Sequence, residues 1–241
     1  MYDLPHLSLR HMTECGIVLR TLHTRAASME DVCNLMVQHL YDELRAGDER
    51  ACVLARAYKT HPYAALDEEL QAFARGVVGY EPAPDTPCLA LLATAGAEPE
   101  WNSRHYSRQH RAIPLSSVEA LQRLPMIGQF VAQLGIDPTA IVHPDRSVIT
   151  DLQQRAFNVF YVADARGSPY IPAQDFVQRH DVRSVLGFGS VLPNGELFAV
   201  VLFTRVDMPR ETAELFRPLA LAAKLSLLPF AHDRVFDVQH V

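Results

Sequence analysis

The spacing of hydrophobic positions predicts a strong helix early in the chain. Residues 28–44 carry apolar side chains at helical intervals, and Ser28 followed three residues later by Asp31 is typical of a helix start. Residues 1–11 show no such periodicity, so we expect them to form a loose arm. The stretch between the arm and residue 28 is only weakly helical.

After this helix, several apolar runs are typical of strands. They cover residues 51–60, 88–96 and 157–165, and the segment 183–206 holds two further runs around a Pro-Asn-Gly turn at 193–195. Because Asn-Gly accepts positive φ angles easily, this segment is predicted to be a β-hairpin. Strands joined in hairpins, with helices at both ends of the chain, predict an α+β fold with a central, mostly antiparallel sheet flanked by helices.

The hairpin carries little chemistry of its own. It has no Gly-x-Ser-x-Gly elbow for a nucleophile, and its Gly-Phe-Gly stretch is not the glycine pattern of a dinucleotide site. Glycine in a strand marks a bulge or a place where another group lies close to the backbone. We therefore expect Gly187 and Gly189 to have a structural role.

Two parts of the sequence resemble a known family. The hairpin and the segment after it, RSVLGFGSVLPNGELFAVVLFTRVDMPRETAELFRPLALAAKLSLLPF, resemble the closing half of a GAF domain. SMEDVCNLMVQHLYDEL followed by ACVLARAYKT resembles the family's entry helix and first strand. The resemblance implies a GAF/PAS-like sensory domain of bacterial signal-transduction proteins, of the type found N-terminal to histidine kinases or cyclases. It places one GAF-like domain at 28–230, after an N-terminal arm and partial helix (1–27) and before a C-terminal tail (231–241).

Composition and charge narrow the expected partners. The 241 residues have a net charge of −6, and such a mildly acidic chain lacks the positive surface of nucleic-acid-binding proteins. No apolar run approaches the roughly 20 residues of a membrane span, and no signal peptide is visible. The four cysteines form no CxxC pair. We expect a cytoplasmic protein with free thiols that binds neither nucleic acid nor membrane.

Residues 97–111, AEPEWNSRHYSRQHR, form the most chemically varied stretch and are predicted to be a long loop. This stretch combines a flat aromatic ring, cations and imidazoles, so the loop could close over an aromatic or anionic small molecule. A solvated connector is the alternative. Together with residues of the strand at 157–165 and of the turn after it, the loop provides the predicted ligand-binding residues: Trp101, Arg104, His105, His110, Tyr161, Tyr170 and Gln174.

Two other classes of function stay open, although we expect no enzymatic activity. A haem-based gas or redox sensor needs a histidine that projects into an apolar cavity, and His110 or His105 is the first candidate. A thiol-dependent enzyme of the methionine sulfoxide reductase kind needs a reactive thiol near a resolving partner, which Cys88 finds in Cys52 only if their strands pair. Buried, inert thiols are the alternative. The histidine spacing predicts no other metal site, and the cofactor stays open.

The C-terminal region predicts how such a domain would signal. Residues 210–230 carry an apolar stripe that predicts one long helix, bent at Pro218, with more apolar surface than packing on a sheet requires. Because GAF domains commonly pair through their first and last helices, the resemblance implies a homodimer. Packing of both helices on their own sheet is the alternative. The resemblance also implies an output module, a histidine kinase or another effector in cis or in trans. This module would respond to binding of a small ligand, or of a partner, through a signal carried by the C-terminal helix.

Overall fold

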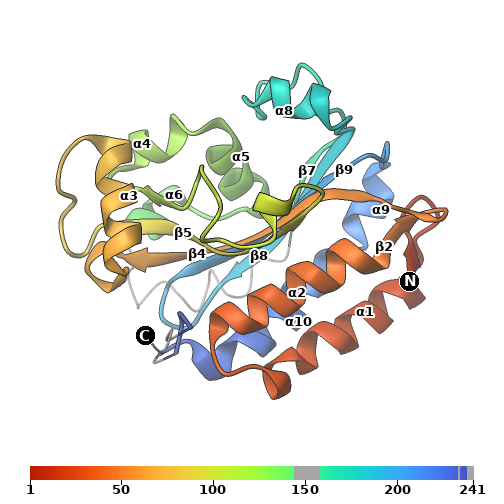
Figure 1. The fold of residues 1–241 in the computed structure, drawn as a ribbon, viewed down its shortest axis with the longest axis horizontal. Helices are drawn as coiled ribbons and strands as arrows, with labels where there is room; N and C mark the ends of the chain where they lie inside the picture. The colour runs from red at the N-terminus through yellow and green to blue at the C-terminus, as the bar shows by residue number, and fades with distance from the viewer. Residues whose placement is uncertain (144–157, 233, 238–241) are drawn as a thin grey trace.

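The computed structural model describes residues 1–143, 158–232 and 234–237. Within these residues, a six-stranded antiparallel sheet lies between two layers of helices (Figure 1). Its strands, in the spatial order β6-β5-β4-β9-β8-β7, are β4 (Cys52–Pro62), β5 (Pro87–Gly96), β6 (Ala112–Pro114), β7 (Val159–Val162), β8 (Ser184–Val191) and β9 (Leu197–Thr204). The predicted α+β class with a mostly antiparallel sheet is confirmed.

Helices cover the two faces of the sheet unequally (Figure 1). One face carries α1 (Leu9–Thr21), α2 (Met29–Glu43), α9 (Arg210–Glu214) and α10 (Arg217–Leu227). The opposite face and the β6 edge carry α3 (Glu68–Val78), α4 (Val118–Gln122), α5 (Pro125–Leu134), α6 (Pro138–Val142) and α8 (Gln174–Arg179). Single 3-10 turns are η1 (Leu22–Arg25), η2 (Tyr63–Ala65), η3 (Pro99–Trp101) and η4 (Leu228–Phe230). No helix among the described residues is long and apolar enough to cross a membrane.

The first residues are ordered, unlike the loose arm expected for 1–11. The short strand β1 (Tyr2–Asp3) pairs in parallel with β2 (Leu44–Ala46), which pairs with β3 (Glu49–Arg50). Leu4 is fully buried. Two apolar residues are too few to produce a periodic pattern, and their partners lie forty residues away in the sequence, so local spacing carried no signal for this strand.

A hydrophobic core lies on each face of the sheet, and β4 contributes to both because its side chains alternate between faces. Ala55 and Ala57 point toward α2, and their small side chains allow this helix to pack closely on the sheet. Leu54 and Tyr58 point to the opposite face. Helix α2 begins as predicted: the Ser28 hydroxyl accepts a hydrogen bond from the Asp31 N–H at 3.0 Å, and the Asp31 carboxylate accepts one from the Ser28 N–H at 3.2 Å.

The predicted hairpin is confirmed as β8 and β9. Gly195 has a φ of +88° in the turn, a conformation that favours glycine. Beside the turn, the carboxylate of Glu196 pairs with the ammonium of Lys59, whose side chain is completely buried. Lys59 also donates to the carbonyl oxygen of Thr60 at 3.1 Å. This ion pair fixes the hairpin turn to the centre of the sheet.

The expected single C-terminal helix is instead two helices, α9 and α10. Pro218 lies in the first turn of α10, where its missing N–H leaves no intrahelical hydrogen bond unmade. Continuing α9 through this position would place the proline ring against the preceding turn, so the chain begins a new helix. The sequence correctly indicated an irregularity at Pro218, but the helix is divided there into two helices and not merely bent.

A short C-terminal segment binds the start of α2. The backbone carbonyl oxygens of Arg234 and Val235 accept hydrogen bonds from the N–H groups of Met29 and Glu30 at 2.7 and 2.8 Å. These N–H groups lie in the first turn of a helix, where no intrahelical acceptor exists. Of the tail predicted at 231–241, residues 233 and 238–241 lie outside the described residues.

Candidate functional site

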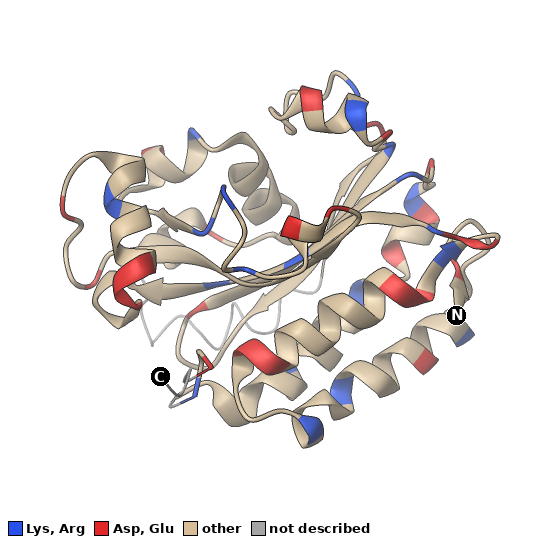
Figure 2. Cartoon of the chain, in the orientation of Figure 1, with Lys and Arg blue, Asp and Glu red and all other residues tan. Residues whose placement is uncertain are grey.

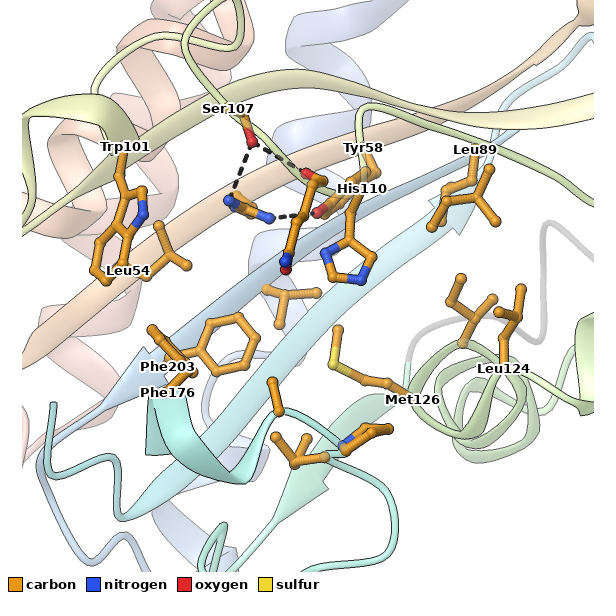
Figure 3. Close-up of a pocket in the computed structure, with 18 of the residues that line it drawn as sticks. Leu54, Tyr58, Leu89, Trp101, Ser107, His110, Leu124, Met126, Phe176 and Phe203 are labelled. Carbon is orange, nitrogen blue, oxygen red and sulfur yellow. Dashed lines mark hydrogen bonds between the residues drawn. The ribbon is translucent and has the colours of Figure 1, made fainter. Parts of the chain in front are cut away.

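A cavity of about 670 Å³ lies on the sheet face opposite α1, α2 and α10 (Figure 3). Side chains of β4, β5, β6 and β9 form its floor, and α5 forms one wall. The opposite wall comprises α8 and residues 171–173 before it. Residues 97–111, which we call the covering loop, extend over the sheet beside these walls. The volume of the cavity falls in the range of small-molecule sites.

The glycines of β8 explain how α5 reaches the sheet. A Cβ atom on Gly187 would lie 2.6 Å from the ring of Phe130, which projects from α5. A Cβ atom on Gly189 would lie 2.3 Å from the carbonyl oxygen of Phe198. Both distances are far below van der Waals contact. The expected close approach at these glycines is confirmed, and at Gly187 it positions the cavity wall.

The start of the covering loop is held by a hydrogen bond and by aromatic packing. At its start, the side-chain oxygen of Asn102 accepts a hydrogen bond from the N–H of Gly96 at 3.0 Å. The Trp101 ring packs edge-on against Phe176, with centroids 5.6 Å apart, and against His180 at 4.8 Å. These two residues belong to α8 and its C-cap, so the chain's one tryptophan joins the covering loop to the opposite wall.

The arginines of the covering loop are neutralised by carboxylates. Figure 2 shows basic positions of this loop above the sheet. The three nitrogen–oxygen distances are 2.6 Å for Arg104 and Glu30, 3.4 Å for Arg108 and Glu100, and 2.7 Å for Arg111 and Glu69. The three arginines of this loop, which were candidates for binding an anionic ligand, therefore already pair with carboxylates of the protein.

Arg56, on the cavity floor, has a different environment. Its side chain is 9% exposed, and no carboxylate of the described residues lies within ion-pair distance of it. The guanidinium donates to the Tyr58 hydroxyl and to the Ser107 hydroxyl, each at 3.3 Å (Figure 3). Its Nε–H has no hydrogen-bond partner among the described residues. Arg56 is thus a buried cation with neutral partners and spare donor capacity.

His110 lies beside this cation at the end of the covering loop (Figure 3). Its backbone φ of 59° is in the left-handed region, which non-glycine residues adopt rarely and often at functional sites. Desolvation by the surrounding protein and the nearby positive charge of Arg56 both lower the pKa of His110. The imidazole is therefore neutral at pH 7 and offers a hydrogen bond, while Arg56 supplies the charge.

The structure brings only part of the predicted ligand-binding set to the cavity. Trp101 and His110 line it. Arg104 points away, toward α2, and its Nε donates to Glu30 at 2.6 Å. The ring of His105 lies between two carboxylates, 4.0 Å from Glu30 and 3.9 Å from Glu69. Of the two histidines named for haem, only His110 faces the cavity.

The other three predicted residues lie elsewhere. Tyr161 is on the α9 side of the sheet, where its hydroxyl donates to the carbonyl oxygen of Met208. Tyr170 is exposed and does not line the cavity. Gln174 organises the turn before α8, because its amide donates to the carbonyl oxygens of Ala165 at 3.0 Å and Ile171 at 2.7 Å. These contacts give Gln174 a role in shaping the cavity wall.

Sequence reasoning missed Arg56, the most distinctive residue of the site. One signal was present: β4 reads CVLARAYKTHP, and an arginine in the middle of an apolar strand has no sequence neighbour to neutralise it. Arg and Lys are almost never fully buried without a partner. A cation in a buried central strand is therefore a candidate binding residue, a signal that loop composition does not give.

The cysteines do not form a reactive pair. All four are buried and free, and burial raises the pKa of Cys52 and Cys88 to about 12. Their strands do pair, but Cys88 lies opposite His61, nine positions along β4 from Cys52. At roughly 3.3 Å per residue, the two thiols are separated by almost the length of the strand. This geometry offers the thiol-enzyme alternative no resolving partner.

Histidines with lowered pKa values predict that stability falls as the pH decreases below neutrality. Burial and the adjacent Lys59 ammonium hold the pKa of His61 well below its usual range, and the pKa values of His39, His110 and His180 are also lowered, chiefly by desolvation. Between pH 7.5 and 5.5 these four imidazoles take up protons in the unfolded chain, where their pKa is about 6.5, and they take up fewer in the folded chain, where their pKa values are lower. Protonation therefore favours unfolding.

We expect urea denaturation at pH 7.5 and 5.5 to show this loss, with about 1 kcal/mol from His61 alone. The His61→Gln variant is the control, because it removes one titrating group and should show a smaller difference between the two pH values. An equal difference in both proteins would contradict the assignment of His61. The carboxylates do not interfere, since they titrate near pH 4.

Comparison with known proteins gives structural similarities alone. No protein-family model and no curated protein matches the sequence. Among solved structures, the chain is similar to the GAF domain of an Acinetobacter phosphoenolpyruvate-protein phosphotransferase, with 14% identity, a TM-score of 0.44 and coverage of 92% of this chain and 94% of that one.

Two further similar structures come from cyanobacterial phytochromes. The phycocyanobilin-bound GAF domain has 10% identity and a TM-score of 0.42 over 92% of this chain and 98% of that one. The phycoerythrobilin-bound GAF domain has 11% identity and a TM-score of 0.41 over 90% and 97%. These three neighbours are GAF domains. At such identities and scores, no ligand is transferred from them to this chain.

Proposed function

We propose that this protein is a GAF-like sensory or regulatory domain of the cytoplasm that binds a small molecule in the cavity and signals through its C-terminal region. The observation that carries the proposal is the cavity itself, about 670 Å³ in volume, with a largely apolar floor. The floor also holds the buried cation of Arg56, which pairs with no carboxylate of the described residues. Apolar walls with a few placed polar groups are typical of small-molecule sites. The four cysteines are buried, and no group of three or more His, Cys, Asp or Glu side chains among the described residues could hold a metal ion.

A chain of direct contacts supports the proposed route of the signal. Arg104 of the covering loop donates to one carboxylate oxygen of Glu30, and the other oxygen accepts a hydrogen bond from the N–H of Asp237 at 3.1 Å. The Arg104 guanidinium also lies 5.3 Å from the ring centre of Phe236. A ligand that binds one position of the covering loop more tightly than another would therefore alter contacts with the C-terminal segment.

We also propose that the protein forms a homodimer through α1 and α10 and acts on an output module, a histidine kinase or another effector. The two helices are in contact at Gly16, where an added Cβ atom would lie 3.7 Å from the Leu219 side chain, an ordinary van der Waals distance. Large apolar side chains of both helices remain exposed, namely Ile17, Leu221 and Leu225. Exposed apolar side chains on adjoining helices support a partner surface.

Melting-temperature measurements with a library of metabolites test the ligand proposal. Ala173 is exposed at the cavity wall, and its replacement by tryptophan would fill the opening without disturbing the core. We expect some compounds to raise the melting temperature of the wild-type protein by several degrees, and the Ala173→Trp variant to lose this response.

The matched control is Ala64→Trp, which adds the same side chain at an exposed position of η2 outside the cavity. This variant should respond to ligands as the wild type does. If no compound stabilises the wild type, or if stabilisation survives in Ala173→Trp, the proposal fails.

A further inference from the structure

We infer that the ligand is an organic carboxylate with an apolar body, and that its carboxylate binds Arg56. This inference rests on the proposed function, because it assigns a chemical class to the occupant of the same cavity. The argument begins with what a buried guanidinium requires. Charged groups taken out of water are strongly unfavourable unless a partner of opposite charge compensates them, and Arg56 has only hydroxyl partners among the described residues.

The guanidinium retains the geometry for an anion. It has five N–H groups, of which one on each terminal nitrogen is directed to a hydroxyl, and Nε–H has no partner. The Tyr58 hydroxyl accepts from Arg56, and its own proton has no acceptor among the described residues. Ser107, by contrast, donates its proton to the carbonyl oxygen of Gln109 at 3.0 Å. A carboxylate at Arg56 would therefore accept hydrogen bonds from the guanidinium and from Tyr58.

The charges around the cavity select a single negative charge. Arg56 contributes one positive charge on the floor, and the neutral imidazole of His110 adds none. At the rim, Arg108 is paired with Glu100, and Asp175 balances Arg179. A carboxylate carries one charge, whereas a phosphate monoester carries up to two at neutral pH and would leave the second uncompensated. A planar carboxylate also matches the fork of the guanidinium.

The remainder of the floor indicates an apolar body. Around Arg56, the strands present Leu54, Leu89, Val201 and Phe203, and α5 presents Phe130. These side chains offer no hydrogen bonds, so polar groups of a ligand placed against this part of the floor would lose water without compensation. The ligand class that satisfies both parts of the cavity is an aromatic or aliphatic carboxylic acid.

Isothermal titration calorimetry with matched probe pairs tests this inference. Each pair keeps the apolar body and exchanges the carboxylate for a hydroxymethyl group: 3-phenylpropanoate and 3-phenylpropan-1-ol, 1-naphthylacetate and 2-(1-naphthyl)ethanol, octanoate and 1-octanol. For the wild type, we expect the carboxylate to bind about 100-fold more tightly than the alcohol in at least one pair, the scale of a desolvated charge-assisted contact. This comparison needs no variant.

Two substitutions assign the preference to Arg56. Arg56→Met keeps the volume and removes the charge, so the preference for the carboxylate should disappear. Arg56→Lys keeps the charge without the fork and should retain a preference reduced about tenfold. Arg20→Met, which removes an exposed arginine on α1, should retain the full preference.

The stability of the unliganded variants gives a second readout. Because an unpaired buried cation destabilises the fold, Arg56→Met should melt about 3 °C or more above the wild type. A lower melting temperature would identify Arg56 as a structural residue and overturn the inference. Equal binding of carboxylates and alcohols, with both bound, would overturn the ligand class and leave the cavity as a ligand site. Binding of no probe would also overturn it, and the metabolite screen with Ala173→Trp would then decide separately whether the cavity binds ligands.

Discussion

Replacing Glu196 with alanine is expected to lower the free energy of unfolding by about 3 kcal/mol. The reason is that the substitution leaves the Lys59 ammonium without its carboxylate partner. Lys59 is completely buried, and the Glu196 carboxylate is the only carboxylate of the described residues that pairs with it. Burial lowers the pKa of Lys59, whereas the charge of Glu196 and its hydrogen bond raise it. Without Glu196, the chain must either bury an unpaired ammonium or deprotonate it, and both are unfavourable.

Urea denaturation of three variants measures this effect. Glu14→Ala is the matched control, because Glu14 forms an exposed ion pair with Arg10 and its loss should leave the stability almost unchanged. The double variant Lys59→Met with Glu196→Ala should recover much of the loss, since it contains no buried charge. Equal effects of Glu196→Ala and Glu14→Ala would show that the buried pair does not hold the hairpin turn.

Replacing Gly189 with alanine is expected to destabilise the protein by a similar amount, about 3 kcal/mol, for a steric reason. The added Cβ atom would lie 2.3 Å from the carbonyl oxygen of Phe198 and 3.1 Å from the Cα atom of Ala199. Both atoms belong to the backbone of β9, so no side-chain rotation relieves the contact. Strands β8 and β9 would have to separate locally, which weakens their hydrogen bonds.

Gly76→Ala provides the control for this substitution. Gly76 lies within α3, and a Cβ atom there meets no other atom within 4 Å. Alanine at this exposed helical position should stabilise the protein by roughly 0.5–1 kcal/mol. Chemical denaturation should therefore give effects of opposite sign for two substitutions that are identical in chemistry. A neutral Gly189→Ala variant would contradict the close approach of β8 and β9 at Gly189.

Local sequence patterns predicted the elements that local chemistry determines. The hairpin at 183–206 follows from alternating apolar runs around an Asn-Gly turn, and the start of α2 follows from Ser28 and Asp31. The antiparallel sheet could be inferred from this hairpin and from the helices expected at both ends of the chain. Features that depend on distant partners could not be inferred. Strand β1 is one example, because its pairing with β2 has no local signal.

The candidate site was predicted in part, for the same reason. The covering loop was identified from its composition, and Trp101 and His110 do line the cavity. Composition did not reveal that Arg104 is neutralised by Glu30, which is 74 positions away in the sequence. It also directed attention away from Arg56, because a cation in an otherwise apolar strand resembles an ordinary edge position until its burial is known. The neutralisation of a charge depends on tertiary contacts.

Native mass spectrometry of the freshly purified full chain tests the central claim, that the cavity binds a small molecule. The protein would be measured alone and after addition of compounds that raise its melting temperature. We predict a mass excess of one small molecule per protomer that disappears on denaturation and is absent from Ala173→Trp. The same spectrum reports whether the protein is a dimer. Bare protein in both samples, or the same adduct on Ala173→Trp, would contradict the assignment of this cavity as a ligand site.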